Sequence, residues 1–159
     1  MAIQGGRPVD RQISALLFVR DAPQAFAFYQ RAFETEVLLR HDPPGGGDLR
    51  IGSGVVSVLA ANPRREAEPQ RGGPFSPEYL GGSGTVLQFY VADVDAAVSR
   101  AVAAGAKVIR PVEDIVTGDR IAMLQDPFGH QWLLATARET ITVEEFERRD
   151  ADLRTSRQP

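Results

Sequence analysis

The chain has 159 residues, of which 43% are apolar and 25% are charged, and its formal net charge is −3. This length and composition predict a single globular domain with a substantial core. The small negative charge argues against binding to nucleic acid or to an anionic membrane, and no apolar run is long enough to span a bilayer. Cysteine is absent, which excludes disulfides and thiolate chemistry and agrees with a cytoplasmic location.

The first half of the chain has the pattern of one βαβββ unit. Residues 1–11 lack an apolar segment and predict a flexible lead-in. The apolar residues 13–19 predict a strand, and Asp21 is the expected N-cap of the helix that follows. The residues on the apolar face of that helix are Phe26, Tyr29 and Phe33. The three short strands expected after it span residues 36–41, 48–52 and 55–61.

The second half repeats this pattern. A strand is expected at residues 85–91, and it precedes a helix that Asp93 caps and Gly105 ends. The three strands expected after this helix span residues 107–110, 120–125 and 131–136.

The two halves align with a constant offset. Asp21 and Asp93 lie 72 positions apart, and the same offset aligns the strands that precede them. We therefore predict an α+β fold made of two βαβββ modules, residues 12–62 and 84–137, which form a curled sheet around a central cavity.

Two segments lie outside the repeat. Residues 63–83 are rich in Pro, Gly and charge, and a connection of this length is unusual within a compact domain. It carries Phe75 and Tyr79, so it is either a surface linker or a lid over a pocket. Residues 138–159 predict a short amphipathic helix, with a capping box that starts at Thr142, followed by a frayed tail.

Two stretches resemble a known family. One is Phe-Val-Arg-Asp-Ala at residues 18–22 with Phe-Tyr-Gln-Arg-Ala-Phe at 28–33. The other runs over residues 93–108 and continues to Asp-Pro-Phe-Gly-His-Gln-Trp at 126–132. Together they resemble the vicinal oxygen chelate superfamily of glyoxalases, bleomycin resistance proteins and dioxygenases, within it the PhnB-like branch. The resemblance implies paired βαβββ modules, whereas the fold alone leaves the function open.

The resemblance also implies where a catalytic metal would bind. Metal-using members take their ligands from the first and fourth strands of each module, at positions that match Ser14, Ser57, Val86 and Leu133 here. None of these is His, Asp or Glu, and a divalent metal needs several nitrogen or oxygen ligands that converge on it. Gln88 stands where PhnB-like relatives often carry a histidine. We therefore expect neither a metal nor another cofactor.

The chain has two histidines, His41 and His130. His41 lies at a predicted strand end, and His130 lies in the corner before the last strand. Both are expected to be exposed loop residues, so they do not rescue a metal site.

Strand alternation predicts which side chains point into the cavity. If Ser14 faces it, so do Leu16 and Phe18, and the offset adds their counterparts from the second half. The candidate ligand-binding residues are Ser14, Leu16, Phe18, Arg50, Ser57, Leu59, Phe75, Tyr79, Val86, Gln88, Tyr90, Arg120 and Leu133. The candidate acid, base or anion-holding groups are Asp48, Tyr90 and Arg120. These walls, mixed apolar and polar, suit a small organic ligand.

Three functions remain open at this stage. The first is metal-free binding of a small, partly apolar organic molecule, for sequestration or resistance. The second is a metal-dependent lyase, isomerase or dioxygenase, and the third is a metal-free cyclase or isomerase. The expected partners are the small molecule and a second copy of the chain in a homodimer, with the C-terminal helix at the interface.

Overall fold

The structure is a computed structural model that describes residues 13–41 and 45–156. The flexible lead-in expected at residues 1–11 and the last residues of the expected tail lie outside this part. The first module comprises β1 (Ala15–Val19), α1 (Ala22–Phe33), β2 (Glu36–His41), β3 (Gly46–Ile51) and β4 (Gly54–Ala60). Its sheet has the order β1-β4-β3-β2, in which β1 and β4 are parallel and the other pairs are antiparallel.

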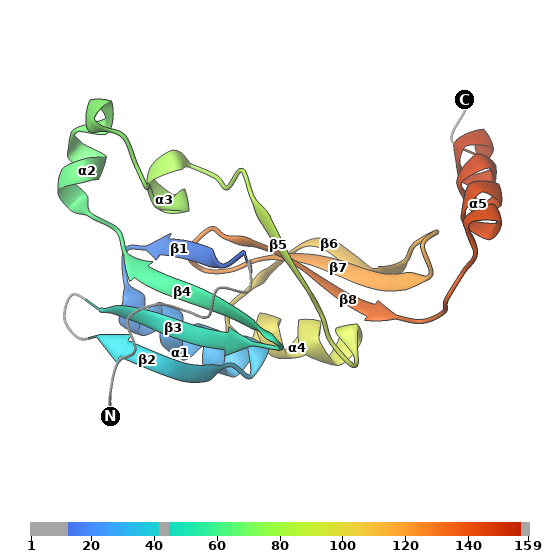
Figure 1. Ribbon diagram of the computed structural model, residues 1–159, viewed down its shortest axis with the longest axis horizontal. Coiled ribbons are helices and arrows are strands. Elements are labelled where there is room, and N and C mark those ends of the chain that lie inside the picture. Colours follow the sequence, from blue (N-terminus) through green and yellow to red (C-terminus); the bar gives the residue numbers. More distant parts are fainter. Residues whose placement is uncertain (1–12, 42–44, 157–159) are drawn as a thin grey trace.

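The second module repeats this arrangement (Figure 1). It comprises β5 (Val86–Tyr90), α4 (Val94–Ala104), β6 (Lys107–Asp114), β7 (Asp119–Gln125) and β8 (Gln131–Ala137). Its sheet order, β5-β8-β7-β6, is equivalent to that of the first sheet. Between the modules lie α2 (Pro63–Ala67), the 3-10 turn η1 (Pro69–Arg71) and α3 (Pro77–Leu80), and α5 (Val143–Ser156) follows the second module. The predicted α+β fold of two βαβββ modules is confirmed.

The strand register confirms the internal repeat. Leu16 pairs with Ser57 in the first sheet, and its counterpart Gln88 pairs with Leu133 in the second. Both predicted N-caps form as well. A carboxylate oxygen of Asp21 accepts a hydrogen bond from the backbone amide of Gln24 at 2.9 Å. A carboxylate oxygen of Asp93 accepts one from the backbone amide of Ala96 at 3.1 Å.

Several strand ends differ from the prediction, most of them by one or two residues. Ser14 precedes β1, although a strand from residue 13 is expected. β6 continues to Asp114, whereas Pro111 favours an end at Arg110. Proline is tolerated there because β6 is an edge strand, and the pairing with β7 is irregular between Arg110 and Glu113.

One continuous core joins the two modules. α1 and α4 pack against each other, and buried residues of both modules belong to one cluster. Aromatic rings of α1 contact rings of the second sheet: Tyr29 lies 5.5 Å from Trp132 and Phe33 lies 5.2 Å from Phe89, between ring centroids. The modules are therefore held together through their helix-covered faces, because this is where the large apolar side chains are buried.

Asp126 anchors the corner between β7 and β8 to α1. It is only 4% exposed and accepts from the Tyr29 hydroxyl at 2.6 Å and from the Trp132 indole at 2.9 Å. It also accepts from the backbone amides of Phe128 and His130, each at 2.9 Å. Burial, with Asp126 nearby, holds the pKa of Tyr29 well above its usual value. The Asp-Pro-Phe-Gly-His motif therefore has a structural role, since a buried carboxylate needs such partners.

Within residues 13–41 and 45–156, no helix covers the opposite faces of the two sheets. On these faces Leu16 is 54% exposed, Val86 is 42% exposed and Tyr90 is 57% exposed. The edge strands β1 and β5 belong to separate sheets, which curl but do not close into a barrel within one chain. The residues predicted to face a cavity thus lie on surfaces away from the shared core.

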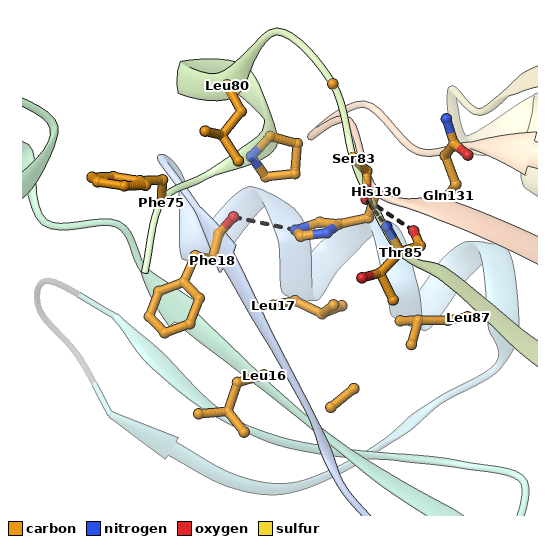
Figure 2. A pocket seen from close by; sticks show the side chains of 14 residues that line it. Leu16, Leu17, Phe18, Phe75, Leu80, Ser83, Thr85, Leu87, His130 and Gln131 are labelled. Atoms are coloured by element: carbon orange, nitrogen blue, oxygen red, sulfur yellow. Dashed lines mark hydrogen bonds between the residues drawn. The ribbon is translucent and has the colours of Figure 1, made fainter. Parts of the chain in front are cut away.

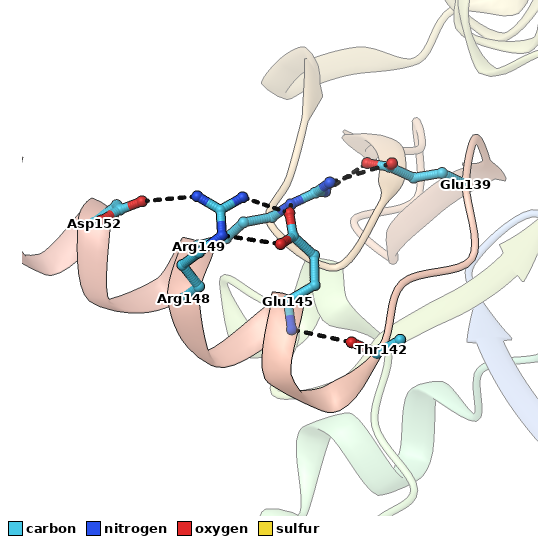
Figure 3. Close-up of polar contacts among 6 residues, drawn as sticks. All are labelled: Glu139, Thr142, Glu145, Arg148, Arg149 and Asp152. Atoms are coloured by element: carbon cyan, nitrogen blue, oxygen red, sulfur yellow. Dashed lines mark hydrogen bonds and ion pairs between the residues drawn. The ribbon is translucent and has the colours of Figure 1, made fainter.

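The C-terminal helix α5 lies apart from the rest of the fold (Figure 1). It has no buried residue, and its charged side chains pair with one another and with Glu139, which precedes the helix (Figure 3). Glu145 binds Arg148 at 2.7 Å and Arg149 at 2.5 Å, and these hydrogen bonds lower its pKa to about 2. The backbone amide of Glu145 donates to the Thr142 hydroxyl, as a cap requires.

No helix in the described ranges is long and apolar enough to cross a membrane.

Candidate functional site

The open face of the first sheet gathers the predicted residues of β1 and β4. Leu16 lies beside Ser57, and Phe18 lies beside Leu59. Asp48 on β3 pairs with Ser57, whose hydroxyl donates to the Asp48 carboxylate at 2.6 Å. Strand register thus places the candidate acid or base Asp48 next to one of the four positions that would hold a metal.

The side chains at the metal positions do not fit a metal ion. Ser14 and Ser57 offer hydroxyls, of which that of Ser57 is committed to Asp48, while Val86 and Leu133 offer no donor atom. Among residues 13–41 and 45–156, no group of three or more His, Cys, Asp or Glu side chains could hold a metal ion. The chemistry of this donor set therefore gives no basis for a metal-assisted step.

The open face of the second sheet carries Val86, Gln88 and Tyr90, all exposed. The Tyr90 hydroxyl donates to Asp119 at 3.1 Å, and this hydrogen bond to a carboxylate raises the pKa of Tyr90. Tyr90 thus keeps its proton near neutral pH, which suits a hydrogen-bond donor better than a general base.

The two arginines of the candidate set are engaged in ion pairs. Arg120 binds Asp95 through two bonds of 2.8 and 3.0 Å and Asp114 through one of 3.2 Å. These hydrogen bonds raise the pKa of Arg120 further above its usual value. Arg50 pairs with Glu36 at 3.0 Å. Either arginine would have to leave a carboxylate before it could bind an anionic ligand.

A cavity of about 290 Å³ lies between β1, α3 and the starts of β5 and β8 (Figure 2). Three predicted ligand-binding residues line it, namely Leu16, Phe18 and Phe75. Tyr79 does not line it, but its ring packs against that of Phe75, with centroids 5.0 Å apart. The lining residues that the sequence reasoning missed include Pro77, Leu80, Ser83, Thr85, Leu87 and His130. Most of them come from the connection between the modules, whose position relative to β1 has no signal in sequence periodicity.

A second hollow, of about 440 Å³, lies at the other end of β1 and β5. It includes Gln88 and Tyr90 from the predicted set. Ser57, Leu59 and Leu133 line neither of these two cavities. In a single chain the predicted residues are therefore divided between separate surfaces rather than gathered in one central cavity.

His130 differs from the expectation of an exposed loop residue. It is half-buried in the cavity wall, and its Nε2 lies 3.2 Å from the carbonyl oxygen of Phe18 (Figure 2). Because a carbonyl only accepts, Nε2 carries the proton and donates. Burial lowers the pKa of His130, so its ring is neutral at pH 7. The prediction was wrong because β1 of the other module covers this corner; His41, in contrast, is exposed.

The connection between the modules is held against the end of β1. The buried Ser76 caps α3 and donates to Glu66 at 2.5 Å. Glu66 also pairs with Arg20 at 3.5 Å, and the backbone amide of Arg20 donates to Glu78 at 3.3 Å. These contacts place Phe75 over the open end of the first sheet, so the segment lines the cavity with its own side chains.

The sequence places the chain in a family. The profile of the Glyoxalase/Bleomycin resistance protein/Dioxygenase superfamily matches residues 11–134, and the chain belongs to this superfamily. An uncharacterized protein of Mycobacterium bovis is 34% identical over 145 residues, which cover 87% of this chain and 91% of the relative. An uncharacterized protein of Mycobacterium tuberculosis H37Rv is also 34% identical, over 87% of this chain and 82% of that protein.

Solved structures share the fold. TioX from Micromonospora sp. ML1 is 26% identical, with a TM-score of 0.58 over 79% of this chain and 97% of that one. The fosfomycin resistance protein FosX from Listeria monocytogenes, solved with Mn(II) and sulfate, is 19% identical, with a TM-score of 0.61 over 89% of this chain and 98% of that one. A glyoxalase-related enzyme from Fulvimarina pelagi is 20% identical, with a TM-score of 0.64 over 84% of this chain and 98% of that one. At these identities, FosX and the Fulvimarina enzyme indicate the fold and no particular reaction.

Proposed function

We propose that this protein binds a small, partly apolar organic molecule without the help of a metal, in a sequestration or resistance role. The observation that carries this proposal is the cavity between β1 and α3, where Leu16, Phe18 and Phe75 form apolar walls. Its volume of about 290 Å³ is close to the lower end of ligand pockets, roughly 300 Å³. It therefore suits a small ligand. A cytoplasmic location and a place in the PhnB-like branch remain predictions.

A metal-free enzyme is the second candidate. The observation that favours it is the Ser57 hydroxyl, which lies 2.6 Å from the Asp48 carboxylate on the open face. Such a pair provides a proton acceptor beside a hydroxyl, as a proton-transfer reaction requires.

We further propose that a second copy of the chain covers the open sheet faces. Large apolar side chains such as Leu16 and Val86 are exposed there, and apolar surface of this kind is stabilised by burial against a partner. Light scattering of the purified protein tests this; a monomer at micromolar concentration would contradict it.

Titration calorimetry against a panel of uncharged aromatic natural products tests the binding function. Phe18→Ala should weaken binding by roughly tenfold, because a large apolar contact is lost. The control is Phe146→Ala, the same change on α5, which should leave the affinity unchanged. No ligand tighter than millimolar, or a stoichiometric metal in the purified protein, would contradict the proposal.

A further inference from the structure

The cavity between β1 and α3 has no charged lining residue in the described part of the chain. Its polar groups are neutral, and they come from Ser83, Thr85, Gln131 and His130. An ion that enters such a site loses its hydration and finds no opposite charge, which is costly.

The charged groups around His130 are already engaged. Asp126 accepts four hydrogen bonds from neighbouring donors. Glu78 on α3 accepts from the Arg20 amide at 3.3 Å and lies 3.9 Å from the Arg20 guanidinium. Both carboxylates already have partners within the protein, so neither is available to pair with a cationic ligand. The Arg20 guanidinium does not line the cavity.

His130 also determines which hydrogen bond a ligand can form. Its Nε2–H donates to the Phe18 carbonyl oxygen, so Nδ1 of the neutral ring is an acceptor. The Ser83 hydroxyl is less available, since it donates to the carbonyl of Thr85 at 2.9 Å and accepts from the Thr85 amide at 3.3 Å. A ligand that donates one hydrogen bond therefore finds an acceptor in His130, and the side-chain amide of Gln131 offers a second acceptor in the cavity wall.

We propose that this cavity selects an uncharged, largely apolar molecule that carries one hydrogen-bond donor, and that it discriminates against the corresponding anion. The inference rests on the proposed binding function and specifies the chemical class of its ligand. Apolar contacts with Leu16, Phe18 and Leu80 supply most of the affinity, and the neutral imidazole orients the ligand.

Two fluorescent probes with one skeleton test the inference. N-phenyl-naphthylamine is neutral and has one N–H donor, whereas anilinonaphthalenesulfonate adds a sulfonate to the same rings. In fluorescence titrations of the full chain, the neutral probe should bind at least about tenfold more tightly than the anion.

Variants that add a positive charge at the cavity wall test whether the two probes bind in this cavity. Leu80→Lys changes a residue of the cavity wall that is 60% exposed, so the fold should tolerate it. The new cation should narrow the affinity ratio of the two probes by at least about threefold. Gly82→Lys is a second variant with the same expectation, because open space surrounds Gly82. Val102→Lys, on an exposed part of α4 away from the cavity, is the matched control and should leave the ratio unchanged.

The outcomes separate the two proposals. If the neutral probe binds no tighter than millimolar, the proposed function itself fails for a ligand of this kind. If both probes bind equally well, the binding function stands and the selection of uncharged ligands is overturned. A probe ratio that Leu80→Lys and Gly82→Lys leave unchanged would place the binding elsewhere and would also overturn the inference.

Discussion

The two modules share one topology and differ in what covers their open faces. Over the end of the first sheet, the connection that contains α3 contributes Phe75 and Leu80 to a cavity wall. After the second sheet, the chain leads to α5, which lies apart and buries none of its residues. The repeat therefore produces two equivalent sheets. The segment that follows the first sheet forms a candidate site on one face of that sheet, whereas the segment that follows the second sheet leaves its open face uncovered.

The candidate polar groups of the two modules also differ in where they lie. On the first face a neutral hydroxyl, that of Ser57, binds Asp48. The second module instead places Arg120 on the α4 side of its sheet, where it forms ion pairs with Asp95 of α4 and with Asp114. Ion pairs of this kind satisfy their charges within the protein, which reduces what they offer a ligand.

The largest expected effect concerns the contact that joins the modules. Asp126→Ala should lower the free energy of unfolding by about 3 kcal/mol or more, because buried donors from both modules lose their acceptor. Urea denaturation measures this. Asp152→Ala on α5 is the control and should change it by less than about 0.5 kcal/mol. A small effect of Asp126→Ala would show that packing alone holds the modules together.

The next effect compares equivalent positions of the two open faces. Leu16→Lys should weaken binding of N-phenyl-naphthylamine by at least about tenfold, because a charge replaces an apolar wall. The same change at its counterpart, Gln88→Lys, should alter the affinity by less than about threefold. An equal loss in both variants would indicate that the two faces line one cavity, as they would if a second copy paired them.

A smaller effect should follow from pH. Burial lowers the pKa of His130 from its usual 6.5, partly opposed by Asp126 and Glu78 nearby. The unfolded chain therefore takes up the proton first, so the contribution of this histidine to stability is constant above about pH 6.5 and decreases below it. Binding of the neutral probe decreases only at the lower pH at which the folded ring takes up its proton. His130→Asn should remove this part of the pH dependence, whereas His41→Asn should retain it. Thermal unfolding and probe titrations at pH 7 and pH 5 measure both.

The smallest effect is expected at the C-terminus. A chain that ends before α5 should keep its urea midpoint, because α5 buries no residue against the modules. Its circular dichroism should lose the helical contribution of α5. Light scattering of this shortened chain shows whether α5 helps a second copy to bind; a lower urea midpoint would mean that α5 supports the fold of a single chain.

Much of the fold could be predicted because local rules and tertiary structure agree. Asp21 and Asp93 are helix N-caps both in the prediction and in the structure, and the 72-residue offset reappears as equivalent strand pairs. The site was harder to predict. Leu16, Phe18 and Phe75 do line a cavity, whereas Arg120 is bound to Asp95, which lies 25 positions away in the chain. Sequence periodicity does not predict an ion pair of this kind.

The sequence by itself determined the two βαβββ modules, their caps and the absence of metal ligands at Ser14, Ser57, Val86 and Leu133. These features depend on side-chain chemistry and on spacings within one element. Only the tertiary structure decided that His130 is half-buried beneath β1 and that α3 forms a wall beside Phe18. Such contacts join residues far apart in the chain, and they form where the shared core and the connecting segment bring separate elements together.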